Sequence, residues 1–321
     1  MRLPVIATLR SRLIALTACV ALLTVSAGCG DDDDDTPAAQ SITDIVINDT
    51  NFSVLEAAVV RAGLADALRG GTLTVFAPTN AAFQAAGITE TSVGTTDVNV
   101  LRNILQYHVL SSRVGSADIQ VANNTAVKTL GGPDVYVTKT QAGRVFVNGA
   151  EVTTADQNAA NGVIHVINRV LMPPPATNGT LVGLVQSNTD LSLLRDAVTR
   201  VATADPTLAT TLTTGTYTIF APTNAAFTAA GFGTTAAINA APIATLRAVL
   251  LNHVVTGRVF SSDLPATGNV AALGGGQLAI TSGSSGVTVR SPGITTAANV
   301  TGANMVATNG VVHVVDRVLL P

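Results

Sequence analysis

The octapeptide Phe76-Ala77-Pro78-Thr79-Asn80-Ala81-Ala82-Phe83 occurs a second time, letter for letter, at Phe220–Phe227. The wider windows Thr72–Gly87 and Thr216–Gly231 are identical at 13 of 16 positions. A match of this length at a separation of 144 residues indicates two copies of a whole domain rather than a solenoid of short repeats.

Two further segments repeat in the same order. Leu101–Val114 matches Leu246–Val259, and Asn161–Pro173 matches Asn309–Pro321 at 9 of 13 positions. The offset between copies changes by only a few residues, so the copies differ mainly in loop length. We therefore predict a first module at residues 41–172, a second module at 180–321 and a proline-rich linker at 173–179.

Within the first module, helical patterns precede strand patterns. Asn51 is the expected N-cap and Gly63 the expected end of a helix whose apolar face comprises Phe52, Leu55, Ala58, Val59 and Ala62. A strand over 72–76 ends at Pro78, and Thr79 or Asn80 caps a short helix after it. A second helix covers 98–109, and later strands are expected at 126–130, 135–139, 144–147 and 163–171. This order predicts an α+β fold with a mainly antiparallel sheet.

The first 28 residues have the pattern of a signal peptide: three arginines, then the apolar run Leu13–Val25. Small residues lead into Cys29, which resembles the lipobox of bacterial lipoprotein precursors and predicts lipidation at Cys29. Cys19 matches the box locally but has almost no apolar run before it. An ordinary signal peptide is the alternative. Residues 29–40 include Asp31–Asp35 and are predicted to form an acidic tether rather than a calcium site.

Composition excludes several functional classes. The formal net charge is −3 and no basic stripe is present, so nucleic acid is not an expected partner. Trp is absent and Tyr occurs three times, which leaves little aromatic surface for stacking sugars or bases. The two cysteines are Cys19 and Cys29, so both modules are free of thiols and depend on packing.

The repeated segments, taken together, resemble the fasciclin domain. The opening segment spans 74–83, the central element is Tyr107-His108-Val109-Leu110, and the closing segment spans 161–171. The second module matches at 218–227 and 309–320, but it has Asn252 before His253 in place of tyrosine. The resemblance implies two tandem wedges of mainly antiparallel sheet with several helices. It also implies an extracellular role in adhesion, with a possible adhesion element at Tyr107 and His108.

The four histidines are His108, His165, His253 and His313, two at matching positions in each module. A paired metal site or a catalytic site would use them, but nothing else at a suitable spacing completes a zinc set or a hydrolase motif. We expect structural roles and no cofactor, metal or catalysis. Structural roles are also predicted for the repeated box residues Phe76, Pro78, Thr79, Asn80, Phe220, Pro222, Thr223 and Asn224.

These observations predict a non-enzymatic protein, secreted or anchored in the cell envelope through a lipid, that mediates adhesion or matrix contact. Its expected partners are envelope, matrix or host-surface proteins or polysaccharide. The alternative function is carriage of an apolar small molecule such as a carotenoid or a lipid. The 47% apolar content favours this alternative, and the scarcity of aromatic residues opposes it.

Overall fold

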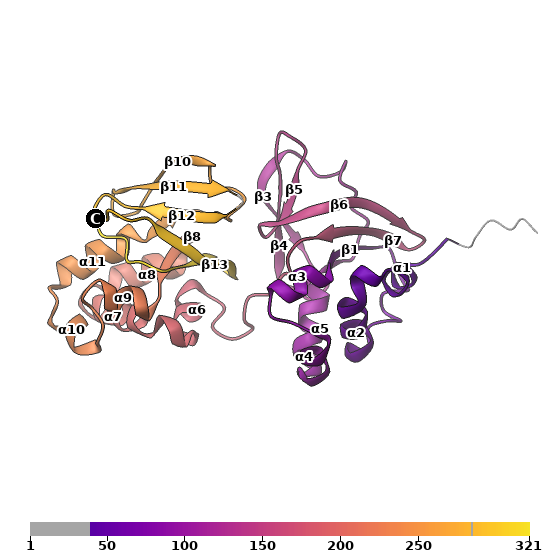
Figure 1. Ribbon diagram of the computed structural model, residues 1–321, viewed down its shortest axis with the longest axis horizontal. Helices are drawn as coiled ribbons and strands as arrows, with labels where there is room; N and C mark the ends of the chain where they lie inside the picture. The colour runs from indigo at the N-terminus through magenta and orange to yellow at the C-terminus, as the bar shows by residue number, and fades with distance from the viewer. Residues whose placement is uncertain (1–38, 284) are drawn as a thin grey trace, which may run out of the picture. The chain divides into compact units, whose positions relative to one another are not determined.

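The computed structural model describes residues 39–283 and 285–321, in which each module forms one seven-stranded sheet with helices gathered beside it (Figure 1). The first module contains, in chain order, α1 (Ile42–Asn48), the 3-10 helix η1 (Thr50–Phe52), α2 (Ser53–Ala62), β1 (Leu73–Pro78), α3 (Asn80–Ala85), α4 (Glu90–Thr95), α5 (Val98–Tyr107), β2 (Val109–Leu110), β3 (Ala122–Lys128), β4 (Asp134–Lys139), β5 (Val145–Val147), β6 (Ala150–Ala159) and β7 (Gly162–Ile167).

The second module repeats this order with one additional helix, α8. It contains α6 (Leu181–Ser187), the 3-10 helix η2 (Thr189–Leu191), α7 (Ser192–Ala204), α8 (Pro206–Thr214), β8 (Tyr217–Pro222), α9 (Asn224–Ala229), α10 (Thr235–Ala240), α11 (Ile243–Asn252), β9 (Val254–Thr256), β10 (Thr267–Ala271), β11 (Gln277–Gly283), β12 (Gly286–Arg290), β13 (Ala298–Ala307) and β14 (Gly310–Val315). None of the helices in the described residues is long and apolar enough to span a membrane.

The two sheets have the same topology. The strand order is β2-β1-β7-β6-β5-β4-β3 in the first module and β10-β11-β12-β13-β14-β8-β9 in the second. All neighbouring pairs are antiparallel except β1 with β7 and β8 with β14, which are parallel. The predicted α+β fold with a mainly antiparallel sheet is therefore confirmed. The parallel pair brings the opening and closing segments of each module into contact.

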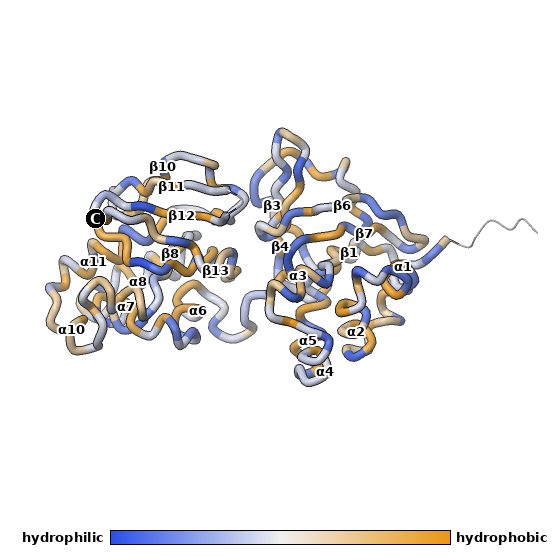
Figure 2. The backbone as a smooth tube through the Cα atoms, viewed as in Figure 1, coloured by the Kyte–Doolittle hydropathy of each residue, from blue (hydrophilic) through white to orange (hydrophobic). Residues whose placement is uncertain are grey.

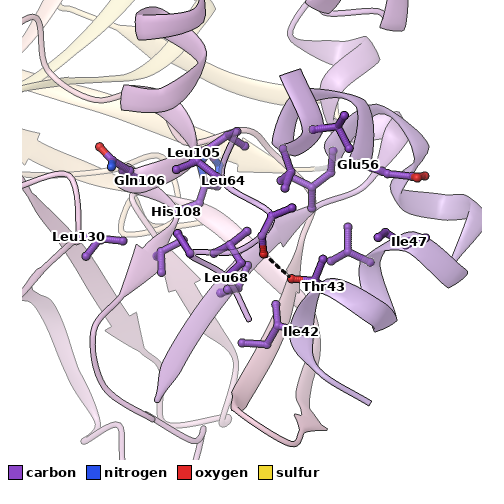
Figure 3. A pocket seen from close by; sticks show the side chains of 18 of the residues that line it. Ile42, Thr43, Ile47, Glu56, Leu64, Leu68, Leu105, Gln106, His108 and Leu130 are labelled. Carbon is purple, nitrogen blue, oxygen red and sulfur yellow. Dashed lines mark hydrogen bonds between the residues drawn. The ribbon is translucent and has the colours of Figure 1, made fainter. Parts of the chain in front are cut away.

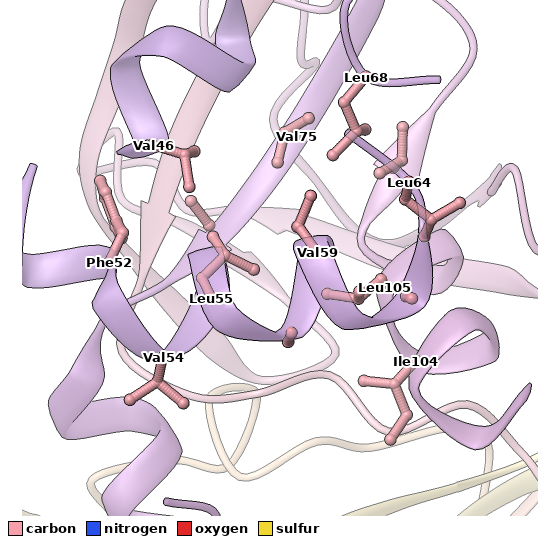
Figure 4. Close-up of a cluster of buried hydrophobic side chains, with 14 of the residues drawn as sticks. Val46, Phe52, Val54, Leu55, Val59, Leu64, Leu68, Val75, Ile104 and Leu105 are labelled. Atoms are coloured by element: carbon pink, nitrogen blue, oxygen red, sulfur yellow. The ribbon is translucent and has the colours of Figure 1, made fainter. Parts of the chain in front are cut away.

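The helix predicted over 52–62 supplies much of the first core, as Figure 4 shows. All five residues of its predicted apolar face are at most 6% exposed: Phe52, Leu55, Ala58, Val59 and Ala62. Burial of a face with this spacing stabilises a short helix that would not form alone. Figure 2 shows that the strands on which these helices pack also contain hydrophobic segments.

Three local predictions were wrong, and the first is the strand expected over 163–171, which ends at Ile167. Asn51 does not cap α2; its own amide donates to Asp49 Oδ1, because Asp49 caps a 3-10 turn that precedes the helix. Helix α5 ends at Tyr107 rather than Val109, because Val109 begins β2 and pairs with Val75. Thr79 does cap α3, with its hydroxyl accepting from the amide of Ala82 at 3.3 Å.

Candidate functional site

The four histidines are all buried, and both ring nitrogens of each contact backbone groups of their own module. His108 donates from Nδ1 to Ile104 O at 2.8 Å and accepts at Nε2 from the amide of Leu171 at 2.9 Å. His253 repeats this arrangement with Val249 O at 2.7 Å and the amide of Leu319 at 2.8 Å. These rings therefore join the C-terminal end of a helix to the segment after the last strand, and they leave no lone pair for a metal.

His165 lies on β7 and His313 lies on β14, the final strand of each module in chain order. His165 Nε2 is 2.9 Å from Val114 O, and Nδ1 accepts from the amide of Asp156 at 3.3 Å. His313 makes the equivalent contacts with Val259 O at 2.9 Å and the amide of Asn304 at 3.3 Å. Residues 39–283 and 285–321 contain no group of three or more His, Cys, Asp or Glu side chains that could hold a metal ion.

Burial changes the proton affinity of three of the four rings. Desolvation lowers the pKa of His108, His253 and His313 to about 4, because the charged imidazolium would lose its hydration inside the core. The rings are therefore neutral near pH 7. A neutral imidazole with both nitrogens occupied cannot exchange a proton with a substrate, so the arrangement favours a structural role.

The predicted adhesion element, Tyr107 and His108, is also buried, with 0% and 2% exposure. The Tyr107 hydroxyl donates to Asp134 O at 2.8 Å and accepts from Asn148 Nδ2 at 2.9 Å. Neither side chain can contact a partner directly in this conformation, and an adhesive role for the pair stays a prediction. In the second module Asn252 donates to Leu319 O at 2.9 Å, and its Oδ1 has no partner within the described part of the chain.

The repeated Asn80 and Asn224 hold two elements together. Asn80 Oδ1 accepts from the amide of Val54 at 3.1 Å, and its Nδ2 donates to Thr50 O at 2.9 Å. Asn224 makes the same two contacts with Leu193 and Thr189, at 2.9 and 3.0 Å. Each amide thereby fixes the start of the long amphipathic helix against the corner after β1 or β8.

An apolar cavity lies beside His108 in the first module (Figure 3). Helices α1 and α2, strand β1 and the end of α5 form its walls, and Thr43 closes one side by donating from Oγ1 to Ala65 O at 3.2 Å. Its volume is about 40 Å³. A space this small holds a few water molecules at most, so it does not accommodate an organic ligand.

A second cavity lies at the equivalent position of the second module, between α6, α7, α8 and β8, with a volume of about 370 Å³. Equivalent residues line both cavities: Val46 and Val185, Leu55 and Leu194, Val59 and Val198, Val75 and Ile219, Leu105 and Leu250, His108 and His253, Val109 and Val254. The second volume falls in the range of ligand pockets, which begins at roughly 300 Å³.

The two cavities differ in how the chain continues after the long helix of each module. Helix α2 ends at Gly63, which adopts φ +66, and Leu64 and Leu68 then fold back over the cavity. Ala202 occupies the place of Gly63 in the second module, and α7 continues to Ala204 because alanine favours the helix. The chain then returns as α8, which covers a wider space.

The rims of the two cavities also differ. Ile47 and Val60 are 43% and 63% exposed at the first rim, and Leu130 is 44% exposed there. Their sequence equivalents at the second rim include Gln186 and Thr199.

The sequence predictions missed both cavities, although the helical patterns located several of the residues that line them. The predicted signal peptide, Cys29 and Asp31–Asp35 lie outside the described residues.

Comparison with known proteins matches both modules to one domain family. The fasciclin domain model matches residues 50–173 and 190–321. Protein sll1483 of Synechocystis sp. is 41% identical over 142 residues, covering 43% of this chain and 77% of the relative. Transforming growth factor-beta-induced protein ig-h3 of Sus scrofa is 41% identical over 140 residues, and cell surface glycolipoprotein MPB83 of Mycobacterium bovis is 36% identical over 111. The ig-h3 alignment covers 43% of this chain and 20% of that relative. The MPB83 alignment covers 35% of this chain and 48% of that relative.

A solved FAS1 domain pair from the insect cell adhesion molecule fasciclin I covers 87% of this chain and 96% of its own, at 19% identity and a TM-score of 0.39. The family model alone accounts for most of the residues that the structure describes, once in each module. The chain therefore belongs to the fasciclin domain family and carries two tandem copies of the domain.

Proposed function

We propose that this chain is a non-enzymatic protein of the cell surface or envelope that mediates adhesion through its first module. Family membership supports this function, since the relatives include a cell surface glycolipoprotein of Mycobacterium bovis. The buried histidines, whose ring nitrogens all contact backbone groups, support a non-enzymatic role. The expected partners are envelope, matrix or host-surface proteins or polysaccharide.

The observation that carries the proposal is the exposed rim of the first cavity. Six large hydrophobic side chains are exposed among the described residues, and three of them line this rim: Ile47, Val60 and Leu130. Ile47 and Leu130 flank the cavity in Figure 3. Apolar side chains clustered at one place on a surface are typical of protein contact sites. The rim of the second cavity carries the polar residues Gln186 and Thr199 in place of Ile47 and Val60.

The experiment exchanges the rim for the residues that the second module carries. A variant with Ile47→Gln and Val60→Thr should fold normally, because both positions are exposed, and should show attachment to cells or matrix that is about tenfold weaker. The matched control is Gln186→Ala with Thr199→Ala, which should attach like the parent. Crosslinking on intact cells, followed by mass spectrometry, identifies the neighbour. Unchanged attachment by the Ile47→Gln, Val60→Thr variant would contradict the proposal.

The proposed anchor is a lipid on Cys29, with residues 29–40 as an acidic tether between the membrane and the first module. Cys29→Ser should move the protein from the membrane fraction to the soluble fraction, and Cys19→Ser should leave it in place. Mass spectrometry of the N-terminal peptide measures the acylation directly. Release by Cys19→Ser, but not by Cys29→Ser, would assign the anchor to the other cysteine.

A further inference from the structure

We infer that the cavity of the second module is a binding site for an uncharged, single-chain lipid. This role goes beyond the adhesive function proposed for the first module and uses different residues. The site is built from α6, α7, α8, β8 and the end of α11, with His253 in its wall. Its volume of about 370 Å³ is large enough for a small organic ligand, whereas the equivalent 40 Å³ space is not.

The interior accepts only apolar groups. Leu194, Ile219, Leu250 and Val254 are at most 7% exposed and present hydrocarbon to the cavity. His253 contributes no free hydrogen-bonding group, because its ring nitrogens already bind Val249 O and the amide of Leu319. An occupant must therefore be a hydrocarbon along the length that it buries, since an unpaired polar group would lose its hydration there.

The rim selects the polar end of the ligand. Gln186, Thr199 and Thr203 are exposed there; the Gln186 amide can donate and accept, whereas the hydroxyls of Thr199 and Thr203 each donate to a helix carbonyl at 2.8 Å and can only accept. No Lys, Arg, Asp or Glu lines the cavity among the described residues. Arg200 donates to Ala241 O at 2.7 Å and lines a neighbouring hollow that shares Thr199 and Thr203 with this rim. The cavity lining itself therefore supplies no counter-ion for a carboxylate head, whereas Gln186 can donate to a hydroxyl or ester head and the threonine hydroxyls can accept from a hydroxyl.

An unfilled apolar cavity also costs stability, because its lining loses packing contacts. Occupation should therefore raise the melting temperature as well as produce a binding signal. The probe is monolauroylglycerol, used below its critical micelle concentration with delipidated full-length chain, and laurate is the charged comparator. Titration calorimetry measures stoichiometry and affinity, and thermal unfolding gives the second readout.

Two blocking variants and one control locate the site. Val198→Phe fills the cavity, and its matched control Val59→Phe places the same change in the first module. Thr203→Phe covers the mouth from an exposed position that tolerates a large side chain, so it carries the test if Val198→Phe fails to fold. We expect one monolauroylglycerol per chain in the parent and in Val59→Phe. The blocking variants should bind at least about tenfold more weakly.

Three results would overturn the inference. They are the absence of monolauroylglycerol binding to the delipidated parent, parental affinity in a folded blocking variant, and weakening by Val59→Phe equal to that by Val198→Phe. Laurate binding as tight as that of monolauroylglycerol would overturn the assignment of an uncharged head group. The rim variant Ile47→Gln with Val60→Thr should bind the lipid normally, which separates this inference from the adhesive function.

Discussion

Phe76 on β1 lies directly opposite His165 on β7, and their rings stack with centroids 5.8 Å apart and planes inclined by 27°. Phe220 and His313 repeat the pair at 5.5 Å and 27°. The first aromatic residue of the repeated octapeptide thus contacts the histidine of the closing segment. The two segments most alike between the modules are structural partners.

Replacing His165 with leucine should lower the free energy of unfolding by about 2–4 kcal/mol. The change removes the stack and leaves Val114 O and the Asp156 amide without their partner. Urea unfolding followed by circular dichroism measures the loss. Treatment of the parent with a chelator is the control, and it should leave the unfolding midpoint unchanged. A loss below about 0.5 kcal/mol, or a midpoint sensitive to the chelator, would argue against a structural histidine.

Stability should fall as the pH is lowered from about 6.5 to 4. Burial lowers the pKa of His108, His253 and His313 from 6.5 to about 4, so in this window the unfolded chain binds protons that the folded chain does not. The stability is fully present above pH 6.5 and decreases by about 2 kcal/mol per histidine at pH 5.

Urea unfolding at several pH values tests this slope. Hydrogen bonds from Ser116 lower the pKa of Asp156, and that carboxylate contributes only as the pH falls below its ordinary value of 3.8. The loss of stability caused by the histidines therefore occurs at higher pH than the loss caused by this carboxylate, and the two can be measured separately. A flat free energy between pH 7 and pH 4.5 would show that the three rings are hydrated or protonated in the folded state.

Gly162 should not tolerate a side chain. A Cβ at this position would lie 2.0 Å from Leu73 O, because the parallel pairing of β1 with β7 brings the two backbones together. Gly162→Ala is expected to cost more than about 3 kcal/mol. Gly94→Ala, in α4 with nothing within 4 Å, is the control and should be neutral or stabilising by up to about 1 kcal/mol. Equal effects of the two changes on the denaturation midpoint would disprove the close approach.

Tyr107→Phe should destabilise the first module by about 1–3 kcal/mol, because Asp134 O and Asn148 Nδ2 both lose a buried partner. Asn252→Leu at the matching position should cost less, since only Leu319 O loses a partner and the Asn252 oxygen is already unpaired among the described residues. Differential scanning calorimetry of both variants compares the two effects. A greater loss from Asn252→Leu would reverse the order expected from these hydrogen bonds.

The sequence predicted the features that depend on local pattern. The apolar spacing of Leu55, Ala58 and Val59 identified α2, and the Asn148-Gly149 pair identified a tight turn in which both residues have positive φ. Strands β4 and β5 were also found close to their observed bounds. The repeated boxes were enough to identify the family and hence the topology, which no single pattern specifies.

Other elements have no sequence pattern that predicts them. Strand β6 is ten residues long, yet its sequence AEVTTADQNA is polar and largely exposed, because it is held by the backbone of β7 rather than by burial of one face. Helix α1 is only seven residues long, and a capping box at Ser41 and Asp44 supports it. The cavities could not be predicted because they depend on where the chain turns after Gly63 in the first module and after Ala204 in the second.

The pairing of β1 with β7 has a consequence for folding during synthesis. Leu73 is made early, and its partner Gly162 leaves the ribosome only after nearly the whole first module has been translated. Contacts between segments so far apart in sequence slow folding and leave the edge of β1 open in the meantime. A nascent or truncated chain that stops before the closing segment should therefore be a target for chaperones and proteases, and completion of each module should be nearly all-or-none.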